Sequence, residues 1–309
     1  MIAKKIKDLA KKKNAVILSH YYQEDEIQDL ADFVGDSLEL SKKAANTDAD
    51  VIVFCGVKFM AEVAKILSPE KKVLIPDKNA GCSLEDSCKV KDFKNFLSKS
   101  ENNFVITYIN SSVELKSVSD VVCTSSSAEK IINNAPKDKN IIFGPDKHLG
   151  AYLQKKTGRK MRIWQGTCVV HENFSEKHLV GLIATKKGAK VIAHPECPEN
   201  LLNYADHIGS TSSLIKYVEG KKGSFIVLTE PGILYKMKQA SPGSDFYPVN
   251  GIGQSGCESC SECPYMRLNT LEKLHDCILK SSNEILLEES IRISAKKSLD
   301  KMFDMLKVC

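Results

Sequence analysis

The sequence has no apolar stretch long enough to cross a membrane. Its longest uncharged apolar run, residues 51–57, is far shorter than the roughly 18 residues that a membrane span needs. The apolar core of a secretory signal is also missing, because Ile2, Ile6 and Leu9 of the basic N-terminus recur at helical spacing instead. We therefore expect a cytoplasmic protein with an amphipathic surface helix at its N-terminus and with no membrane segment or targeting peptide.

Charge of one sign is not concentrated anywhere in the chain. There are 44 Lys and Arg against 39 Asp and Glu, a net charge of +5, and the lysines are scattered in pairs. Nucleic-acid binding usually needs a basic patch interleaved with aromatic residues, so we expect no nucleic-acid partner. A small positive excess fits better with small anionic substrates drawn into a cleft.

Cysteine, in contrast, is plentiful. The chain has 11 cysteines. Without a secretory signal, a disulfide framework is not expected, whereas thiolates can serve as metal ligands in a reducing compartment. Metal chemistry is therefore the leading hypothesis.

Three segments of the chain repeat one pattern. Residues 105–132 align without a gap with residues 191–218 at an offset of 86, and residues 16–44 align with the second copy at an offset of 88. Each copy reads as an apolar strand, a polar loop, a helix, a short strand that follows an aspartate, and a second helix. Two further strands follow in each copy, at 51–54 and 73–76, at 141–143 and 162–164, and at 225–228 and 246–249. Alternation of strands and helices predicts parallel sheets covered by helices.

The repeats predict an α/β fold of three similar three-layer αβα domains, whose short parallel sheets are arranged around a pseudo-threefold axis. We expect the domains at 1–84, 85–170 and 171–268. A C-terminal helical segment, 269–309, is expected to pack back on the first domain.

The last strand of every copy leads to one cysteine. These are Cys82, Cys168 and Cys263. Ligands of α/β units bind outside the carboxyl ends of the strands. Three domains around one axis would therefore direct the three thiols into one cleft and favour a shared metal centre.

Polar residues also fall in register after the first strand of each copy. The equivalent sets are His20, Tyr108 and His194; Tyr22, Asn110 and Glu196; and Ser37, Ser125 and Thr211. The last set lies where the second helix begins, with Asp36 to Glu39 and Ser126 to Glu129 at capping-box spacing. Helix N-termini suit phosphate and carboxylate groups. One such residue alone is more often structural, but different side chains on a repeated frame favour a site for an asymmetric ligand.

Two motifs in the cysteine-rich loop could indicate a different kind of binding site. The segment Cys257-Glu-Ser-Cys260-Ser-Glu-Cys263 is similar to the start of a ferredoxin cluster run, but the next cysteine, Cys277, lies in an expected helix. A zinc site would need a second pair of cysteines at comparable spacing, and the sequence shows no such pair. If Cys263 is the ligand, Cys257 and Cys260 are free to form a reversible disulfide. Residues 251–256 match GxGxxG, but neither a helix nor the expected acidic residue follows, so we interpret them as a loop.

The ordered motifs SHYYQ, ADFVGDSLELS, GVKFMAE, YINSS, VCTSS, FGPDKHLG, AHPECP, GSTSS and CPYMRLNTLE resemble the quinolinate synthase family over nearly the whole chain. The resemblance implies three α/β domains around a 4Fe-4S cluster held by Cys82, Cys168 and Cys263. It also favours Cys263 over Cys257 and Cys260. Tyr21 differs from the Asn that many members carry, which puts little in doubt.

The resemblance implies a transferase of NAD biosynthesis that condenses iminoaspartate with dihydroxyacetone phosphate, giving quinolinate, phosphate and water. An L-aspartate oxidase or aspartate dehydrogenase would supply the iminoaspartate. Tyr22, His194 and Glu196 are expected to move protons. The full set of implied catalytic and binding residues is His20, Tyr22, Ser37, Tyr108, Asn110, Ser125, His171, His194, Glu196 and Thr211.

Three other functions remain open from the residues alone. Three cysteine ligands would leave one iron of a 4Fe-4S cluster open, and this iron would act as the Lewis acid of quinolinate formation. A hydro-lyase would use the same open iron to dehydrate a hydroxy acid. An electron carrier or iron-sulfur sensor would leave the His, Tyr and Glu positions unexplained. A structural zinc protein would be colourless.

Overall fold

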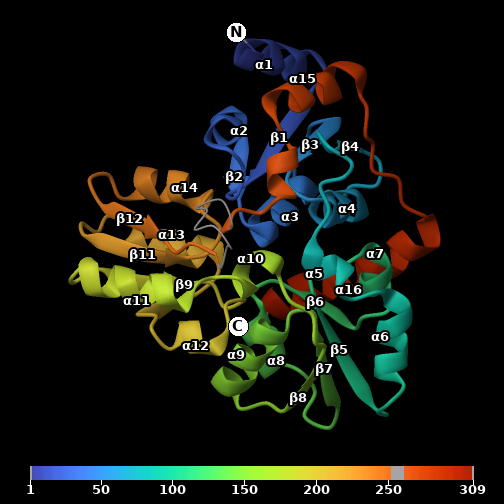
Figure 1. Cartoon of the computed structure of the whole chain (residues 1–309). Helices are drawn as coiled ribbons and strands as arrows, with labels where there is room; N and C mark the ends of the chain where they lie inside the picture. The colour runs from blue at the N-terminus through green and yellow to red at the C-terminus, as the bar shows by residue number, and fades with distance from the viewer. Residues whose placement is uncertain (1, 252–260, 308–309) are drawn as a thin grey trace.

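The computed structural model describes residues 2–251 and 261–307. Within these ranges the strands form three four-stranded sheets, and every neighbouring pair of named strands is parallel. The strand orders are β2-β1-β3-β4, β6-β5-β7-β8 and β10-β9-β11-β12, so one topology occurs three times. The three sheets and their helices surround a common centre (Figure 1). The predicted α/β fold class is confirmed.

Each sheet and its helices are called a unit here. The first unit contains α1 (Ile2–Lys12), β1 (Ala15–His20), α2 (Asp25–Leu30), β2 (Phe33–Gly35), α3 (Ser37–Ala45), β3 (Val51–Cys55), α4 (Lys58–Leu67) and β4 (Lys72–Leu74). The second contains α5 (Ser83–Asp86), α6 (Val90–Leu97), β5 (Asn103–Tyr108), α7 (Val113–Ser117), β6 (Val121–Cys123), α8 (Ala128–Asn133), β7 (Asn140–Gly144), α9 (Lys147–Thr157) and β8 (Met161–Ile163). The third contains α10 (Val169–Glu172), α11 (Glu176–Thr185), β9 (Lys190–Ala193), α12 (Glu199–Leu202), β10 (His207–Ile208), α13 (Thr211–Val218), β11 (Ser224–Leu228), α14 (Ile233–Ala240) and β12 (Asp245–Pro248). The chain then continues through η2 (Met266–Leu268), α15 (Leu271–Lys280) and α16 (Glu289–Lys307).

One aspartate in each unit ties the first strand to the short strand beside it. Its side chain accepts the amide proton of the residue 15 positions earlier, near the start of the first strand. The three bonds are Ile17 N to Asp32 Oδ2 at 2.8 Å, Val105 N to Asp120 Oδ2 at 2.7 Å, and Val191 N to Asp206 Oδ2 at 2.9 Å. The aspartates that coincide in the sequence repeat are therefore structural.

Capping boxes were predicted at the starts of two helices, and the structure contains one of them. Asp36 and Glu39 form the expected capping box at the start of α3. The box expected between Ser126 and Glu129 is wrong. The turn before α8 is closed instead by Ser127, whose Oγ accepts the amide of Thr124 at 2.8 Å, and Glu129 pairs with Lys156.

The C-terminal helices divide between two units. Helix α15 packs on α1, whereas α16 lies mainly against α7 and β6 of the second unit and also touches α4 and α8. The C-terminal segment therefore packs on the first unit through α15, whereas α16 packs mainly on the second unit and partly, through α4, on the first. Because α7 and α8 are short, they leave β6 to be covered by the buried face of α16, formed by Ala295, Ser298, Leu299, Met302 and Met305.

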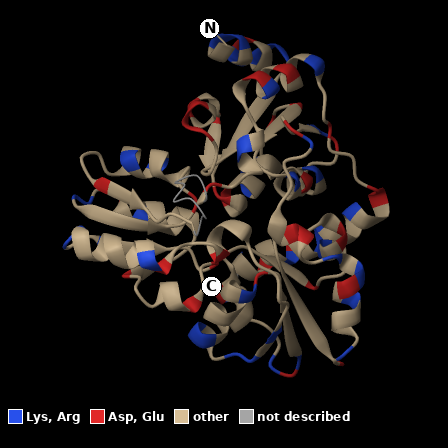
Figure 2. Cartoon of the chain, in the orientation of Figure 1, with Lys and Arg blue, Asp and Glu red and all other residues tan. Residues whose placement is uncertain are grey.

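Charged side chains are distributed over all three units. Segments of Lys or Arg and segments of Asp or Glu are scattered over the helices and loops (Figure 2). In the described part of the chain, no helix combines the length and the apolar character that spanning a membrane requires.

Candidate active site

The carboxyl ends of the strands in all three units open into one cavity. Every residue that the sequence analysis assigned to the site lines this cavity, and these residues come from all three units. They are His20, Tyr22, Ser37, Cys82, Tyr108, Asn110, Ser125, Cys168, His171, His194, Glu196, Thr211 and Cys263. The chain thus brings together side chains separated by more than 200 residues, because each sheet ends at the same centre.

The three cysteines occupy the same local structure. Each one starts a helical turn, in which the amide four residues later donates to the carbonyl of the cysteine. The bonds are Asp86 N to Cys82 O at 2.9 Å, Glu172 N to Cys168 O at 3.0 Å, and Arg267 N to Cys263 O at 3.2 Å. Amide groups at the start of such a turn favour negative charge, here a thiolate.

The three cysteine thiols are suited to bind a metal ion or cluster. Burial raises the pKa of all three thiols, that of Cys263 to about 11, and backbone amides of the following turn oppose the shift. A bound cation would stabilise the thiolates further. Among the described residues, Cys168, His171 and Glu196 also have ligand atoms within 4.8 Å of one another, a spacing that suits a single ion. Cys82, Cys168 and Cys263 line the same cavity, and cysteine thiolates are the usual ligands of iron-sulfur clusters.

A continuous chain of polar contacts crosses the cavity from the first unit to the second. The hydroxyl of Tyr22 lies 2.6 Å from Thr229 Oγ1, which lies 3.0 Å from His171 Nε2. Nδ1 of His171 lies 3.3 Å from Glu196 Oε2, and the hydroxyl of Tyr108 donates a hydrogen bond of 2.7 Å to Glu196 Oε1. These five buried side chains can therefore exchange or share protons across the site.

Two histidines in equivalent positions are held neutral. Burial lowers the pKa of His20 to about 3, with a further contribution from the neighbouring His194. Burial also lowers the pKa of His194, to about 4. The amides of Tyr22 and Glu196 donate to Nδ1 of His20 and of His194, at 3.2 and 3.3 Å. An amide can only donate, so Nδ1 accepts and the proton of each neutral ring sits on Nε2.

Glu196 is the anionic member of the site. Burial alone would raise its pKa, but His171, His194 and the hydroxyl of Tyr108 outweigh burial and lower the pKa to about 2. Burial also raises the pKa of Tyr22 and of Tyr108 well above the usual value. At neutral pH, Glu196 is therefore a carboxylate, Tyr22 and Tyr108 are phenol donors, and His20 and His194 are neutral imidazoles.

Two helices begin at the wall of the cavity, and a third begins close to it. Ser37 and Thr211 are the first residues of α3 and α13, and Ser125 precedes α8. Asp36 caps α3 through Oδ1, and its Oδ2 accepts a proton from Ser212 Oγ at 2.6 Å, which joins the first and third units. Hydroxyl groups beside helix N-termini can bind carboxylate or phosphate oxygens.

The sequence analysis missed Thr229 and Glu230, which follow β11. The structure shows the equivalence of this position in two units, because Asp146 lies two residues beyond β7 just as Glu230 lies two residues beyond β11. The gap-free repeat alignment at an offset of 86 could not show it, since it sets Asp146 against Gly232. Burial raises the pKa of Glu230 to about 7, opposed by Arg267 and by the amides of Gly232 and Cys263.

The remaining cysteines separate into two groups. Those at 55, 88, 123, 197 and 277 are buried free thiols. Cys257, Cys260 and Cys309, like positions 252–256 of the GxGxxG match, lie outside the described residues. Gly251, the first residue of that match, pairs with Phe174 in an isolated bridge.

Known proteins are similar to this chain over almost its whole length. The family model described as NadA, quinolinate synthetase A protein, matches residues 4–304. The chain is 58% identical over 305 residues to a quinolinate synthase of Ehrlichia chaffeensis, covering 98% of this chain and 97% of that protein. It is 56% identical over 301 residues to a quinolinate synthase of Prochlorococcus marinus, covering 97% and 90%. The chain therefore belongs to the quinolinate synthetase A family.

Proposed function

We propose that this protein condenses iminoaspartate with dihydroxyacetone phosphate to give quinolinate, phosphate and water for NAD biosynthesis. The observation that carries the proposal is the meeting of three structurally equivalent cysteines with the Tyr22 to Tyr108 chain of polar contacts in one cavity. Family membership supports the same reaction. The substrates are anionic, which suits a cavity bordered by helix starts.

A 4Fe-4S cluster fits the cysteine set. Cys82, Cys168 and Cys263 would hold it, and backbone amides of the turn that follows each cysteine favour the thiolate form. With these three cysteines as its protein ligands, the cluster would supply Lewis-acid activation of a substrate oxygen.

Proton transfers are assigned to the buried polar residues. Glu196 is ionised and accepts protons, while Tyr22 and Tyr108 retain theirs and donate. His194 presents a neutral ring whose Nε2 proton can stabilise a developing negative charge. Enolisation, ring closure and dehydration all require such proton movements, and positioned side chains contribute to them by general acid and base catalysis.

Substrate binding is assigned to the hydroxyl and amide side chains. Ser37, Ser125 and Thr211 lie near the starts of α3, α8 and α13, and Asn110 lines the same cavity after β5. These groups can orient the carboxylates of one substrate and the phosphate of the other. His20 completes the wall beside Tyr22, with the two ring centres 4.6 Å apart.

The test is an anaerobic activity assay. Protein purified without oxygen is incubated with dihydroxyacetone phosphate and with iminoaspartate generated by an L-aspartate oxidase or an aspartate dehydrogenase, the proposed upstream partner. We expect quinolinate and phosphate in equal amounts. An iron-loaded protein that makes no quinolinate but dehydrates a hydroxy acid would refute the proposal in favour of a hydro-lyase.

A further inference from the structure

A buried carboxylate of the third unit connects one of the candidate cluster ligands to the loop that carries Tyr22. Glu230 is 1% exposed and lies at the end of β11. Its Oε1 accepts from the amide of Cys263 at 3.3 Å and from Arg267 Nη2 at 2.9 Å, and its Oε2 accepts from the amide of Gly232 at 2.7 Å. The side chain of Glu230 thus accepts three hydrogen bonds, and the donors come from two segments of the chain.

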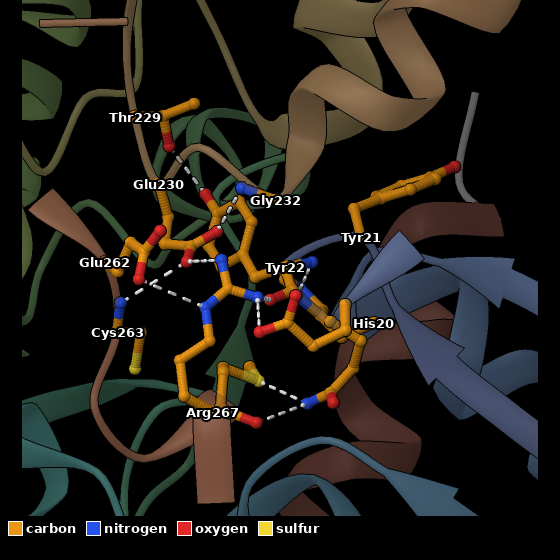
Figure 3. A network of polar contacts seen from close by, with 12 residues as sticks. His20, Tyr21, Tyr22, Thr229, Glu230, Gly232, Glu262, Cys263 and Arg267 are labelled. Atoms are coloured by element: carbon orange, nitrogen blue, oxygen red, sulfur yellow. Dashed lines mark hydrogen bonds and ion pairs between the residues drawn. The ribbon is translucent and has the colours of Figure 1, made fainter. Parts of the chain in front are cut away.

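Arg267 extends this network to the first unit. Its Nη1 donates to the carbonyl of Tyr22 at 3.3 Å and pairs with Glu24 Oε1 at 3.1 Å. Figure 3 shows Arg267 between Glu230 and the loop of His20 and Tyr22, with the Cys263 side chain close by. The guanidinium group therefore links the Cys263 segment to the backbone of Tyr22.

The packing at Gly232 shows how closely the two units meet. A Cβ atom at this position would lie 2.8 Å from Glu230 Oε2 and 2.8 Å from Cα of Tyr22. Gln28, from the first unit, donates to the carbonyl of Gly232 at 3.1 Å. The start of α14 is therefore fixed against the Tyr22 loop, and Glu230 lies at this junction.

We propose that Glu230, acting through Arg267, is a positioning residue that holds Cys263 in place as a cluster ligand and keeps it in register with Tyr22. This inference rests on the proposed function. Because Glu230 holds the amide of Cys263 and not its sulfur, its role is to fix the backbone from which the thiol projects. Partners that orient metal ligands in this way typically contribute 10- to 100-fold to metal affinity or activity.

The test compares Glu230→Gln with Glu262→Gln. Glutamine keeps the shape of Glu230, but one of its two acceptor oxygens becomes a donor and must face an N–H group. Glu262 is the matched control, because it contacts Nε of the same arginine, at 3.7 Å, from a half-exposed position. Both variants replace a carboxyl group beside Arg267 by an amide.

The first readout is the rate at which the anaerobic holoprotein loses iron to a chelator. We expect about a 10- to 100-fold faster loss for Glu230→Gln and a rate close to that of the unaltered protein for Glu262→Gln. The second readout is the alkylation rate of each cysteine in the reduced, metal-free protein, measured by peptide mass spectrometry. Cys263 should react faster in Glu230→Gln, while Cys82 should not change.

Equal acceleration at Cys82 and Cys263 would mean general loosening and would overturn the inference. So would an iron-loaded Glu230→Gln that loses iron at the unaltered rate, although the proposed function would then stand. If the unaltered protein binds no iron, the proposed function fails first, and this inference fails with it.

Discussion

Replacing Glu196 by Gln should abolish most of the activity and leave the iron in place. The carboxylate accepts the Tyr108 hydroxyl proton at 2.7 Å and contacts His171 at 3.3 Å, and its pKa of about 2 keeps it ionised. Glutamine can still accept from Tyr108, but it carries no charge and takes up no proton at neutral pH.

The size of this effect follows from the role assigned to Glu196. A positioned acid or base contributes about 10²- to 10⁴-fold to the rate, which corresponds to about 3 to 5 kcal/mol of barrier at 1.36 kcal/mol per factor of ten. We expect kcat for quinolinate formation to fall by that factor. Glu172→Gln is the control, because Glu172 lies on α10 but pairs with Lys147 and His148 on the outer side of the network.

The iron content of the same variant separates the two kinds of metal site. If three cysteines hold a cluster, Glu196→Gln retains its iron and its visible absorption. If a single ion is held by Cys168, His171 and Glu196, the variant loses metal together with activity. Full turnover in Glu196→Gln, or loss of its metal, would refute the role given to this residue.

Three further predictions test other parts of the account. Thr229→Val removes the hydroxyl that joins Tyr22 to His171 and should lower kcat at least about tenfold, whereas Thr229→Ser should restore most of it; equal rates for the two variants would contradict the proton chain. Asp120→Ala leaves the buried amide of Val105 without its acceptor and should lower the free energy of unfolding, measured with urea, by about 1 to 3 kcal/mol; an unchanged midpoint would contradict its structural role. In the metal-free protein, His20 and His194 have folded pKa values of about 3 and 4, below the value of about 6.5 in the unfolded chain. The unfolded state therefore binds more protons as pH falls below 6.5, and urea unfolding at pH 7 and pH 5 should show a loss of about 2 kcal/mol for each histidine; a pH-independent stability would contradict their burial as neutral rings.

The repeated pattern in the sequence was sufficient to predict the three sheets. Strand and helix periodicities are local, and an alignment of the chain with itself transfers each prediction to two other places. The same alignment placed Cys82, Cys168 and Cys263 around one centre, since equivalent positions on equivalent units point to the same axis. The structure places all three at the cavity.

The contacts between units could not be predicted in this way. Thr229 meets Tyr22 across 207 residues of the chain, and Glu230 meets Arg267 across 37. Both contacts arise from tertiary packing, which no local pattern in the sequence encodes. The sequence did not indicate that α16 packs mainly on the second unit, because an amphipathic face shows that a helix is covered but does not show by what. The capping box at Ser126 failed because a local bond between Ser127 and Thr124 closes the turn first.

The most direct test of the central claim is the iron and sulfide content of five single alanine variants, purified without oxygen. Cys82→Ala, Cys168→Ala and Cys263→Ala each remove one proposed ligand, while Cys55→Ala and Cys277→Ala remove buried thiols elsewhere. We predict that the unaltered protein and the two controls contain a 4Fe-4S cluster and that each ligand variant has lost most of its iron. Full iron content in any one of the three ligand variants, or its loss in both controls, would contradict a cluster shared by three equivalent cysteines.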